Sequence, residues 1–101
     1  MSLIHHIQTG SATTSGGSAT VSLTCMHSQI ALVYVEPTTA STVYDVKLTD
    51  TYNIDVYHRK NNTNILRDFN RPVPVYNNMT LTIENSTADE AFTYLLVFRE
   101  S

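Results

Sequence analysis

Short stretches in which apolar and polar residues alternate dominate the chain. Residues 21–25, 44–48, 52–56 and 79–84 each place an apolar side chain at every second position, with small polar or charged residues between them. Because successive side chains of a β-strand point to opposite faces, this period of two predicts strands with one buried and one solvated face. Thr, Val, Ile and Tyr, which fill many of these positions, fit a pleated, half-buried surface. The pattern therefore predicts antiparallel sheets.

Turn signals separate these stretches. Residues 49–51 fit a tight hairpin, residues 60–64 are a polar loop rich in Asn, and residues 85–90 are long enough only for a connection. Pro72 and Pro74 exclude a central strand around them, since proline cannot donate to a strand ladder. Strands that recur roughly every 8–12 residues predict an all-β fold. We expect an antiparallel β-sandwich, jelly-roll-like, with about seven or eight short strands.

The N-terminal segment differs from the rest of the chain. Residues 1–20 end in QTGSATTSGGSAT, which holds no large apolar residue, whereas Leu3, Ile4 and Ile7 form a short apolar tip. This composition is typical of a flexible arm, so the chain divides into an N-terminal segment and a β-sandwich domain over residues 21–101. The arm has two interpretations: an edge strand followed by a loose loop in its own subunit, or an extension that reaches a neighbouring subunit.

Two stretches break the alternation. Residues 30–35 are apolar throughout, and residues 92–98 are apolar except for Thr93. A strand that is apolar on both faces needs cover on both, and a sandwich of this length has little chain to cover its outer face. This pattern favours a homo-oligomer. The predicted oligomer interface consists of Ile30, Leu32, Val33, Tyr34, Val35, Leu95 and Val97.

Length and composition exclude several other classes of protein. The chain has 101 residues, which is enough for one hydrophobic core, and it is 42% hydrophobic and 15% charged, too apolar for a disordered chain. A net charge of −3 gives no general electrostatic case for binding nucleic acid. No apolar run approaches the roughly 20 residues of a membrane-spanning helix. One cysteine and no secretion signal at the start predict folding in a reducing cytoplasm.

The residues that could carry chemistry form no recognisable catalytic or metal-binding motif. The four histidines lie at no ligand spacing, so we expect no metal or other cofactor, unless a threefold axis brings His5 or His58 of several chains together. No serine lies in a nucleophile elbow. Asp45 and Asp55 fall on the solvated side of their strands, where Lys47 and Arg59 can neutralise them. The sequence does not indicate an enzyme.

A carbohydrate-binding module remains an alternative. Exposed Tyr and Asn side chains on a β-sandwich can stack against a sugar and hydrogen-bond to its hydroxyls, although the chain has no Trp. The residues to test for this activity are Tyr57, Tyr76 and the Asn-rich segments 61–64 and 77–78.

The layout of residues 43–99 resembles that of small virion proteins of tailed phages. An alternating strand at 44–48, a tight turn and a strand at 52–57 come first, then Leu66-Arg67-Asp68-Phe69, a Pro-containing connection, the strand 79–84 and an apolar last strand. The layout is similar to that of β-sandwich capsid decoration or cement proteins. That resemblance implies a structural protein of the virion, assembled in the host cytoplasm, often a homotrimer, which acts by contact and has no catalytic residues.

The sequence therefore favours a self-associating structural protein that stabilises a phage capsid, with a carbohydrate- or receptor-binding β-sandwich module as the alternative. Its expected partners are copies of itself and a major capsid protein or another virion protein, with no nucleic acid and no membrane. The arm and the Pro-containing loop are the segments best placed to touch a different protein. The predicted partner contacts are Leu3, Ile4, Ile7, Pro72, Val73, Pro74 and Tyr76.

Overall fold

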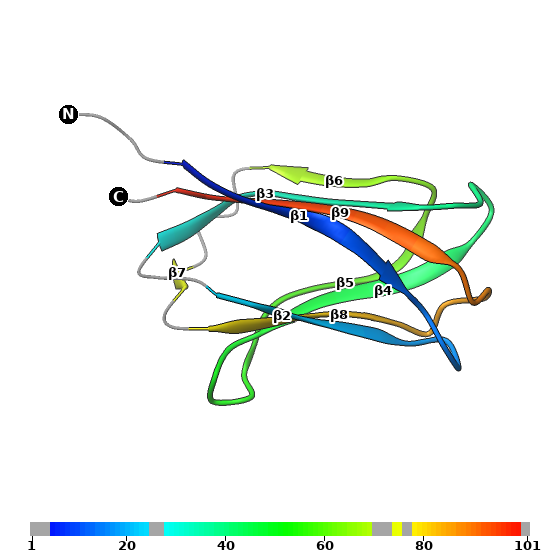
Figure 1. The fold of residues 1–101 in the computed structure, drawn as a ribbon, viewed down its shortest axis with the longest axis horizontal. Coiled ribbons are helices and arrows are strands. Elements are labelled where there is room, and N and C mark those ends of the chain that lie inside the picture. Colours follow the sequence, from blue (N-terminus) through cyan, green and yellow to red (C-terminus); the bar gives the residue numbers. More distant parts are fainter. Residues whose placement is uncertain (1–4, 25–27, 70–73, 76–77, 100–101) are drawn as a thin grey trace.

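The computed structural model describes residues 5–24, 28–69, 74–75 and 78–99. Over these residues the chain forms two antiparallel sheets that lie face to face, one above the other in Figure 1. The described part of the chain contains no helix, and so none of the length and apolar character needed to cross a membrane.

The first sheet has the strand order β1-β9-β3-β6, and the two-residue strand β7 also pairs with β3. We call it the upper sheet, from its place in Figure 1. Its strands are β1 (His5–Thr13), β9 (Ala91–Arg99), β3 (Ser28–Pro37), β6 (Leu66–Phe69) and β7 (Pro74–Val75).

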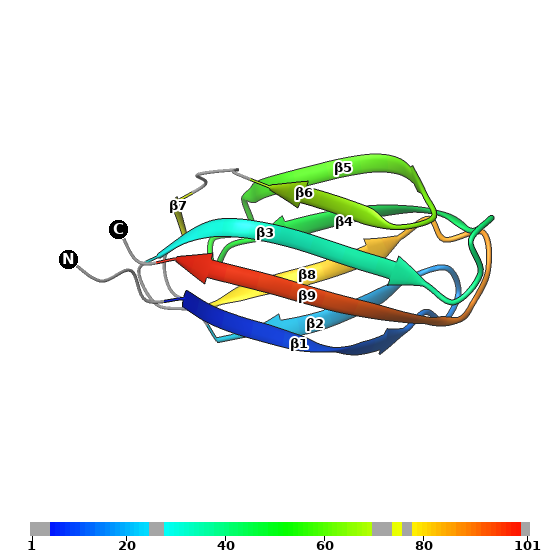
Figure 2. The ribbon, with the colours of Figure 1, turned by 90° about the horizontal axis from the view of Figure 1, so that it is seen from above.

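The second sheet, the lower sheet of Figure 1, has the order β2-β8-β4-β5. Its strands are β2 (Ala19–Leu23), β8 (Met79–Glu84), β4 (Val43–Thr49) and β5 (Asp55–Thr63). Seen from above, the strands of the two sheets run in roughly similar directions (Figure 2). Early and late strands are interleaved in each sheet, with β9 between β1 and β3 and with β8 between β2 and β4, which is the jelly-roll arrangement. The predicted jelly-roll-like β-sandwich is confirmed.

The core lies between the sheets and is built by the alternation that the sequence shows. Tyr44, Val46 and Leu48 of β4 are fully buried, while the residues between them face out of the lower sheet. The rings of Tyr44 and Phe92 make an edge-to-face contact with centroids 5.0 Å apart. Its hydroxyl lies 2.7 Å from the carbonyl oxygen of Asn64, between the two sheets. Burial raises the pKa of Tyr44 to about 12.

Residues 5–13 form the edge strand β1 of the upper sheet, as the first of the two interpretations of the N-terminal segment has it, whereas the loose loop expected after this strand is a tight connection. β1 pairs with β9 along its length, from His5 opposite Arg99 to Thr13 opposite Ala91. The small residues have a packing role there: a Cβ added at Gly10 would lie 2.7 Å from the hydroxyl oxygen of Tyr94.

The Ser/Gly-rich stretch forms the tight connection between β1 and β2. Gly16 and Gly17 have φ of 62° and 82°, a conformation that glycine adopts without steric cost. Their N–H groups donate to the carboxylate of Asp89 at 3.1 and 2.8 Å. The low-complexity sequence therefore reflects a tight turn joining strands of opposite sheets.

The hairpin of β4 and β5 also differs from the prediction. Residues 50–54 form a turn, and β5 begins only at Asp55. β5 then continues to Thr63, so residues 60–63 are strand where we expected a loop. The pairing shifts beside Asn61, whose φ is 57°, and this bulge gives the Asn-rich segment its loop-like sequence.

The predicted oligomer interface divides between two faces of the upper sheet. Ile30, Val33 and Val35 have no exposed surface, because they face the lower sheet across the core. The prediction is wrong for these three. A strand that is apolar on both faces still buries one of them inside its own sandwich. The outer face carries the other four, which are half-buried: Leu32, Tyr34, Leu95 and Val97.

The predicted partner contacts lie mostly outside the described residues. Leu3, Ile4, Pro72, Val73 and Tyr76 belong to that group. Ile7 is on β1 with 63% of its surface exposed. Pro74 pairs with Gln29 at an end of β3, away from the sheet centre, as expected of a residue without an N–H.

Candidate functional site

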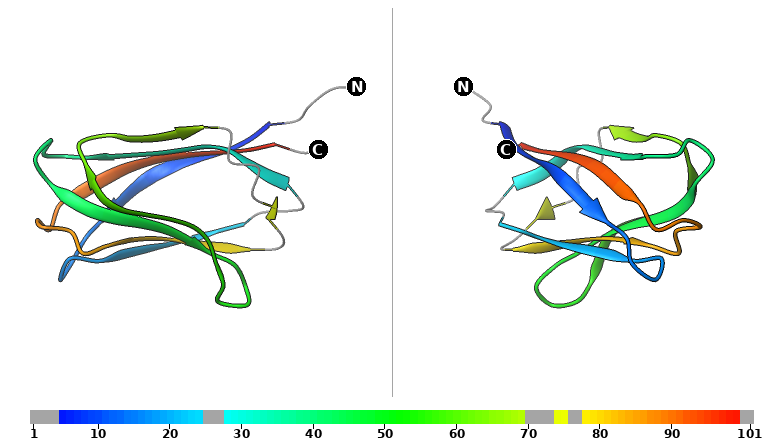
Figure 3. Two further views of the ribbon diagram at one scale, coloured as in Figure 1. Left: turned by 180° about the vertical axis from the view of Figure 1, so that it is seen from behind. Right: turned by 45° about the vertical axis from the view of Figure 1, so that its right-hand side comes forward.

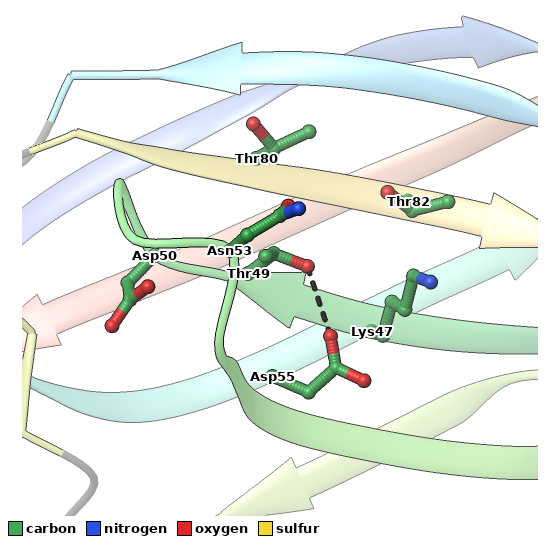
Figure 4. Close-up of a pocket in the computed structure, with 7 residues that line it drawn as sticks. All are labelled: Lys47, Thr49, Asp50, Asn53, Asp55, Thr80 and Thr82. Carbon is green, nitrogen blue, oxygen red and sulfur yellow. Dashed lines mark hydrogen bonds between the residues drawn. The ribbon is translucent and has the colours of Figure 1, made fainter.

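A polar hollow of about 360 Å³ opens on the outer face of the lower sheet. It is bounded by β8, by the end of β4, by the turn 50–54 and by the start of β5 (Figure 4). A volume of this size lies near the lower end of the range of about 300–1,000 Å³ for small-molecule sites. The hollow is lined by Lys47, Thr49, Asp50, Asn53, Asp55, Thr80 and Thr82.

The alternation of β4 and β8 puts the polar side chains in the hollow. Leu48 and Leu81 are paired in the register and point into the core, so their neighbours Thr49, Thr80 and Thr82 point outward. Thr49 and Thr82 are nevertheless only 8% exposed, because the turn and neighbouring side chains surround them. The hollow thus has hydroxyl groups at its base, and charged groups stand around them (Figure 4).

The turn 50–54 is held by Asp50. Its Oδ1 accepts hydrogen bonds from the N–H groups of Tyr52 and Ile54, both at 2.9 Å. Its backbone N–H donates to the carbonyl oxygen of Ile54 at 3.0 Å. Asn53 has a φ of 67°, a left-handed conformation that Asn tolerates better than most residues. A turn with this many internal bonds gives the hollow a fixed rim.

The same turn presents two apolar side chains to solvent. Tyr52 is 76% exposed and Ile54 is 58% exposed, the first between two residues that line the hollow. The turn projects from the sandwich on the side away from the upper sheet, which is clear in the rear and oblique views (Figure 3). An exposed aromatic ring beside a polar hollow is a combination suited to ligand contact.

Some polar groups of the hollow are engaged within the protein and others are not. Asp55 accepts a hydrogen bond from the hydroxyl of Thr49 at 3.2 Å (Figure 4). Among the described residues, the side chains of Asn53, Thr80 and Thr82 have no hydrogen-bond partner. An amide and two hydroxyls can each donate and accept, so the hollow offers both kinds of group to a ligand.

A second polar group lies on the same outer face, beyond Lys47. Asp45 is 7% exposed, and its two carboxylate oxygens accept from the backbone N–H of Asn61 and the side-chain amide of Asn85, each at 2.8 Å. These two bonds lower the pKa of Asp45. Donor atoms of Asp45, His58 and Glu84 all lie within 4.8 Å of one another, a set that could hold a metal ion.

The ion pairs differ from the expected ones. Asp45 is buried on the outward side of β4, where we expected a solvated charge, and backbone and amide donors satisfy it. Lys47 pairs with Glu84 at 3.4 Å. Arg59 lies 3.8 Å from Asp68. The prediction that Lys47 and Arg59 neutralise Asp45 and Asp55 is therefore wrong, because both basic residues pair with other carboxylates.

Two of the residues that the sequence offered for sugar contact, Tyr57 and Asn62, are engaged within the protein. Tyr57 is 7% exposed and donates to Asp68 at 2.9 Å, so its ring faces the interior. Asn62 donates from its amide to the carbonyl oxygens of Tyr44 and Arg59 and holds the end of the hairpin. Tyr76 and residue 77 lie outside the described residues, and Asn78 is exposed beside β8.

Sequence reasoning missed Tyr52 and the threonines of the hollow. It placed Tyr52 on the apolar side of a strand, because Tyr52, Ile54 and Val56 alternate with polar residues. Asp50 is the signal in the sequence that could have placed Tyr52 in a turn and not in a strand. Aspartate at the start of a turn binds the backbone N–H two residues later, and here that residue is Tyr52.

Comparison with known proteins bears on the fold. No protein-family model and no curated protein matches the chain. Among solved structures, the chain is similar to the lectin binding domain of Lectinolysin, in a histidine mutant complexed with Lewis b, with a TM-score of 0.52. The match covers 93% of this chain and 92% of that one at 11% sequence identity. At that identity the likeness concerns the fold alone.

Proposed function

We propose that this protein is a carbohydrate-binding β-sandwich module, with its binding site at the polar hollow and the turn 50–54. The observation that carries the proposal is the exposed ring of Tyr52 in a turn whose Asp50 and Asn53 line a hollow rich in hydroxyl, amide and carboxylate groups. This is the alternative that the sequence left open, moved from Tyr57 and Tyr76 to a different part of the surface.

The chemistry of the hollow suits a sugar. A sugar ring has hydroxyls that both donate and accept, and C–H edges that pack against the negative face of an aromatic ring. Asn53 and Thr80 can bond to hydroxyls, and Asp55 accepts from them. A pocket for an ordinary apolar ligand would be lined mainly by hydrophobic side chains, and this one is not.

The rigidity of the turn supports binding as well. Asp50 fixes the backbone on both sides of Asn53, so little conformational entropy is lost when a ligand contacts the rim. The fold is compatible with the proposal, because the domain of similar fold is a lectin binding domain whose structure is of a complex with Lewis b. No residue role is transferred from that domain.

A glycan array with four forms of the protein tests the proposal. Wild type and Tyr52→Phe, which retains the ring, should bind the same glycans. Tyr52→Ala should lose about tenfold or more in affinity, since stacked rings contribute of order 1 kcal/mol beyond the area they bury. The matched control is Phe69→Ala, which removes an exposed aromatic ring from the other sheet.

Two results would contradict the proposal. One is wild-type protein that binds no glycan on a broad array. The other is Tyr52→Ala that binds as wild type does while Phe69→Ala does not. The resemblance to phage decoration proteins stays a prediction, because neither the fold nor the comparisons distinguish it from other β-sandwich proteins.

A further inference from the structure

The group of Asp45, His58 and Glu84 lies outside the hollow and is not needed for the proposed function. The three residues come from three neighbouring strands of the lower sheet. In the register, Asp45 of β4 is directly opposite Glu84 of β8, and His58 of β5 is opposite Lys47, two residues along β4. Side chains at such positions on one face are close enough to meet, and their donor atoms lie within 4.8 Å of one another.

We propose that Asp45, His58 and Glu84 form a site for one zinc ion on the outer face of the lower sheet. Three protein ligands, two carboxylate oxygens and one imidazole nitrogen, leave a further position for water, as in zinc sites that are open to solvent. Calcium takes six to eight oxygen ligands and magnesium favours oxygen-rich octahedra, so the imidazole favours zinc.

Asp45 is fixed in place before any ion binds. The bulge in β5 turns the N–H of Asn61 toward one carboxylate oxygen, and Asn85, just after β8, donates to the other. Each oxygen still has a second lone pair, so the same oxygen can accept a hydrogen bond and ligate a metal ion at the same time. Hydrogen-bonded carboxylates of this kind are typical of metal sites, where outer partners orient the ligands.

The other two ligands can adjust. Zinc holds its oxygen and nitrogen ligands at about 2.0–2.2 Å, which requires the donor atoms to move somewhat closer than 4.8 Å. His58 is exposed and Glu84 is half-buried, so both side chains have room to rotate toward the ion. Both stand on rigid strands, so their backbones are already in position.

The geometry also contains a competitor for the metal. Asp45 and Glu84 are two carboxylates directly opposite each other, an arrangement that is destabilising without a cation. The ammonium group of Lys47, 3.4 Å from Glu84, supplies part of the needed charge. A zinc ion on Glu84 would lie near this ammonium group, and the two positive charges repel each other. Removal of Lys47 should therefore strengthen zinc binding, whereas removal of a ligand should weaken it.

Calorimetric titration of the full chain with zinc chloride tests the site, with no sugar present. Wild type should bind one equivalent of zinc. His58→Gln and Glu84→Gln should each lower the affinity for zinc by about tenfold or more, since loss of even an outer partner of a metal ligand costs about 10–100-fold in affinity. Lys47→Met should tighten binding by up to about fivefold, the effect of one surface ion pair. Calcium chloride should give no comparable binding.

The control is the double variant His5→Gln/His6→Gln, which removes two other histidines. It should keep the site. Cobalt absorption spectra give a second readout, because the tetrahedral signal should be absent in His58→Gln. The inference is overturned if wild type binds no zinc, if His58→Gln and Glu84→Gln bind as wild type does, if Lys47→Met weakens binding, or if the double variant abolishes it. Because no glycan is present, these outcomes are independent of the proposed function.

Discussion

The hydroxyl of Tyr44 lies 2.7 Å from the carbonyl oxygen of Asn64 and joins β4 of the lower sheet to the connection that leads into the upper sheet. The same hydroxyl lies 3.2 Å from the carbonyl oxygen of Val35 on β3. One buried tyrosine thus places its ring in the core and its polar end where β5 leaves one sheet and β6 enters the other.

Replacement of this hydroxyl should lower stability without disturbing the core. Tyr44→Phe retains the ring and its edge contact with Phe92 but leaves the carbonyl groups without their donor. We expect the free energy of unfolding to fall by about 1 kcal/mol, measured by urea denaturation. Tyr52→Phe is the control, because that side chain is 76% exposed, and it should unfold as wild type does. Equal stability of Tyr44→Phe and wild type would contradict this role.

Asn64 itself occupies a conformation that few residues adopt. Its φ is 58°, in the left-handed region, at the step between β5 and β6. Asn64→Ala should lower the free energy of unfolding by roughly 1–2 kcal/mol, the cost of this region for a residue with a Cβ. Asn64→Gly should retain most of the stability, because glycine adopts positive φ without that cost. If both variants unfold alike in urea, backbone strain is not the cause.

A further prediction concerns acid pH and Glu90. Its carboxylate accepts from the N–H of Thr39 at 2.8 Å, and this bond lowers the pKa of Glu90 below its usual value. The folded protein therefore favours the ionised form. The contribution is complete above the unfolded pKa of about 4.5 and is lost as pH falls through the lower folded pKa.

Glu90→Gln keeps an oxygen acceptor but has no charge to lose. Its stability should fall less steeply than that of wild type between about pH 5 and pH 3, as followed by thermal melting at a series of pH values. Parallel curves for the two proteins would show that the Thr39 contact does not contribute to acid stability.

The sequence predicts much of the fold but little of the candidate sites. Alternation alone located β4 and β8 and their buried faces, since the periodicity of a strand is written directly into its sequence. For β1 the sequence left an edge strand as one of two interpretations, because Gly10 and Ala12 are too small to continue an apolar period. Gly10 lies there because the Tyr94 side chain occupies the space that a Cβ would need, which no local pattern reveals.

The candidate sites depend on contacts between residues far apart in the chain. Asp45 meets Asn85, and Thr49 shares a hollow with Thr80, only because β8 pairs with β4. In the sequence, His58 is one of four histidines that lie at no ligand spacing. Its neighbours Asp45 and Glu84 follow from the strand order, which the sequence left open.

Self-association stays a prediction, and the structure defines the face on which to test it. Ile7, Val97, Leu32 and Phe69 are aligned by the strand register into one row across β1, β9, β3 and β6. We call them the apolar row. Ile7 is 63% exposed and Phe69 is 55% exposed, at the two ends of the row. Such a continuous apolar surface is typical of a contact between proteins.

If the apolar row is an interface between copies of the chain, wild-type protein should have a mass above 11.3 kDa by light scattering after size exclusion. Leu32→Glu, at the centre of the row, should reduce the mass to that of one chain, because a buried, unpaired carboxylate is costly at an interface. Thr20→Glu adds the same charge to the outer face of β2 and should leave the mass unchanged. A wild-type mass of one chain at every concentration of a dilution series would exclude self-association through this face.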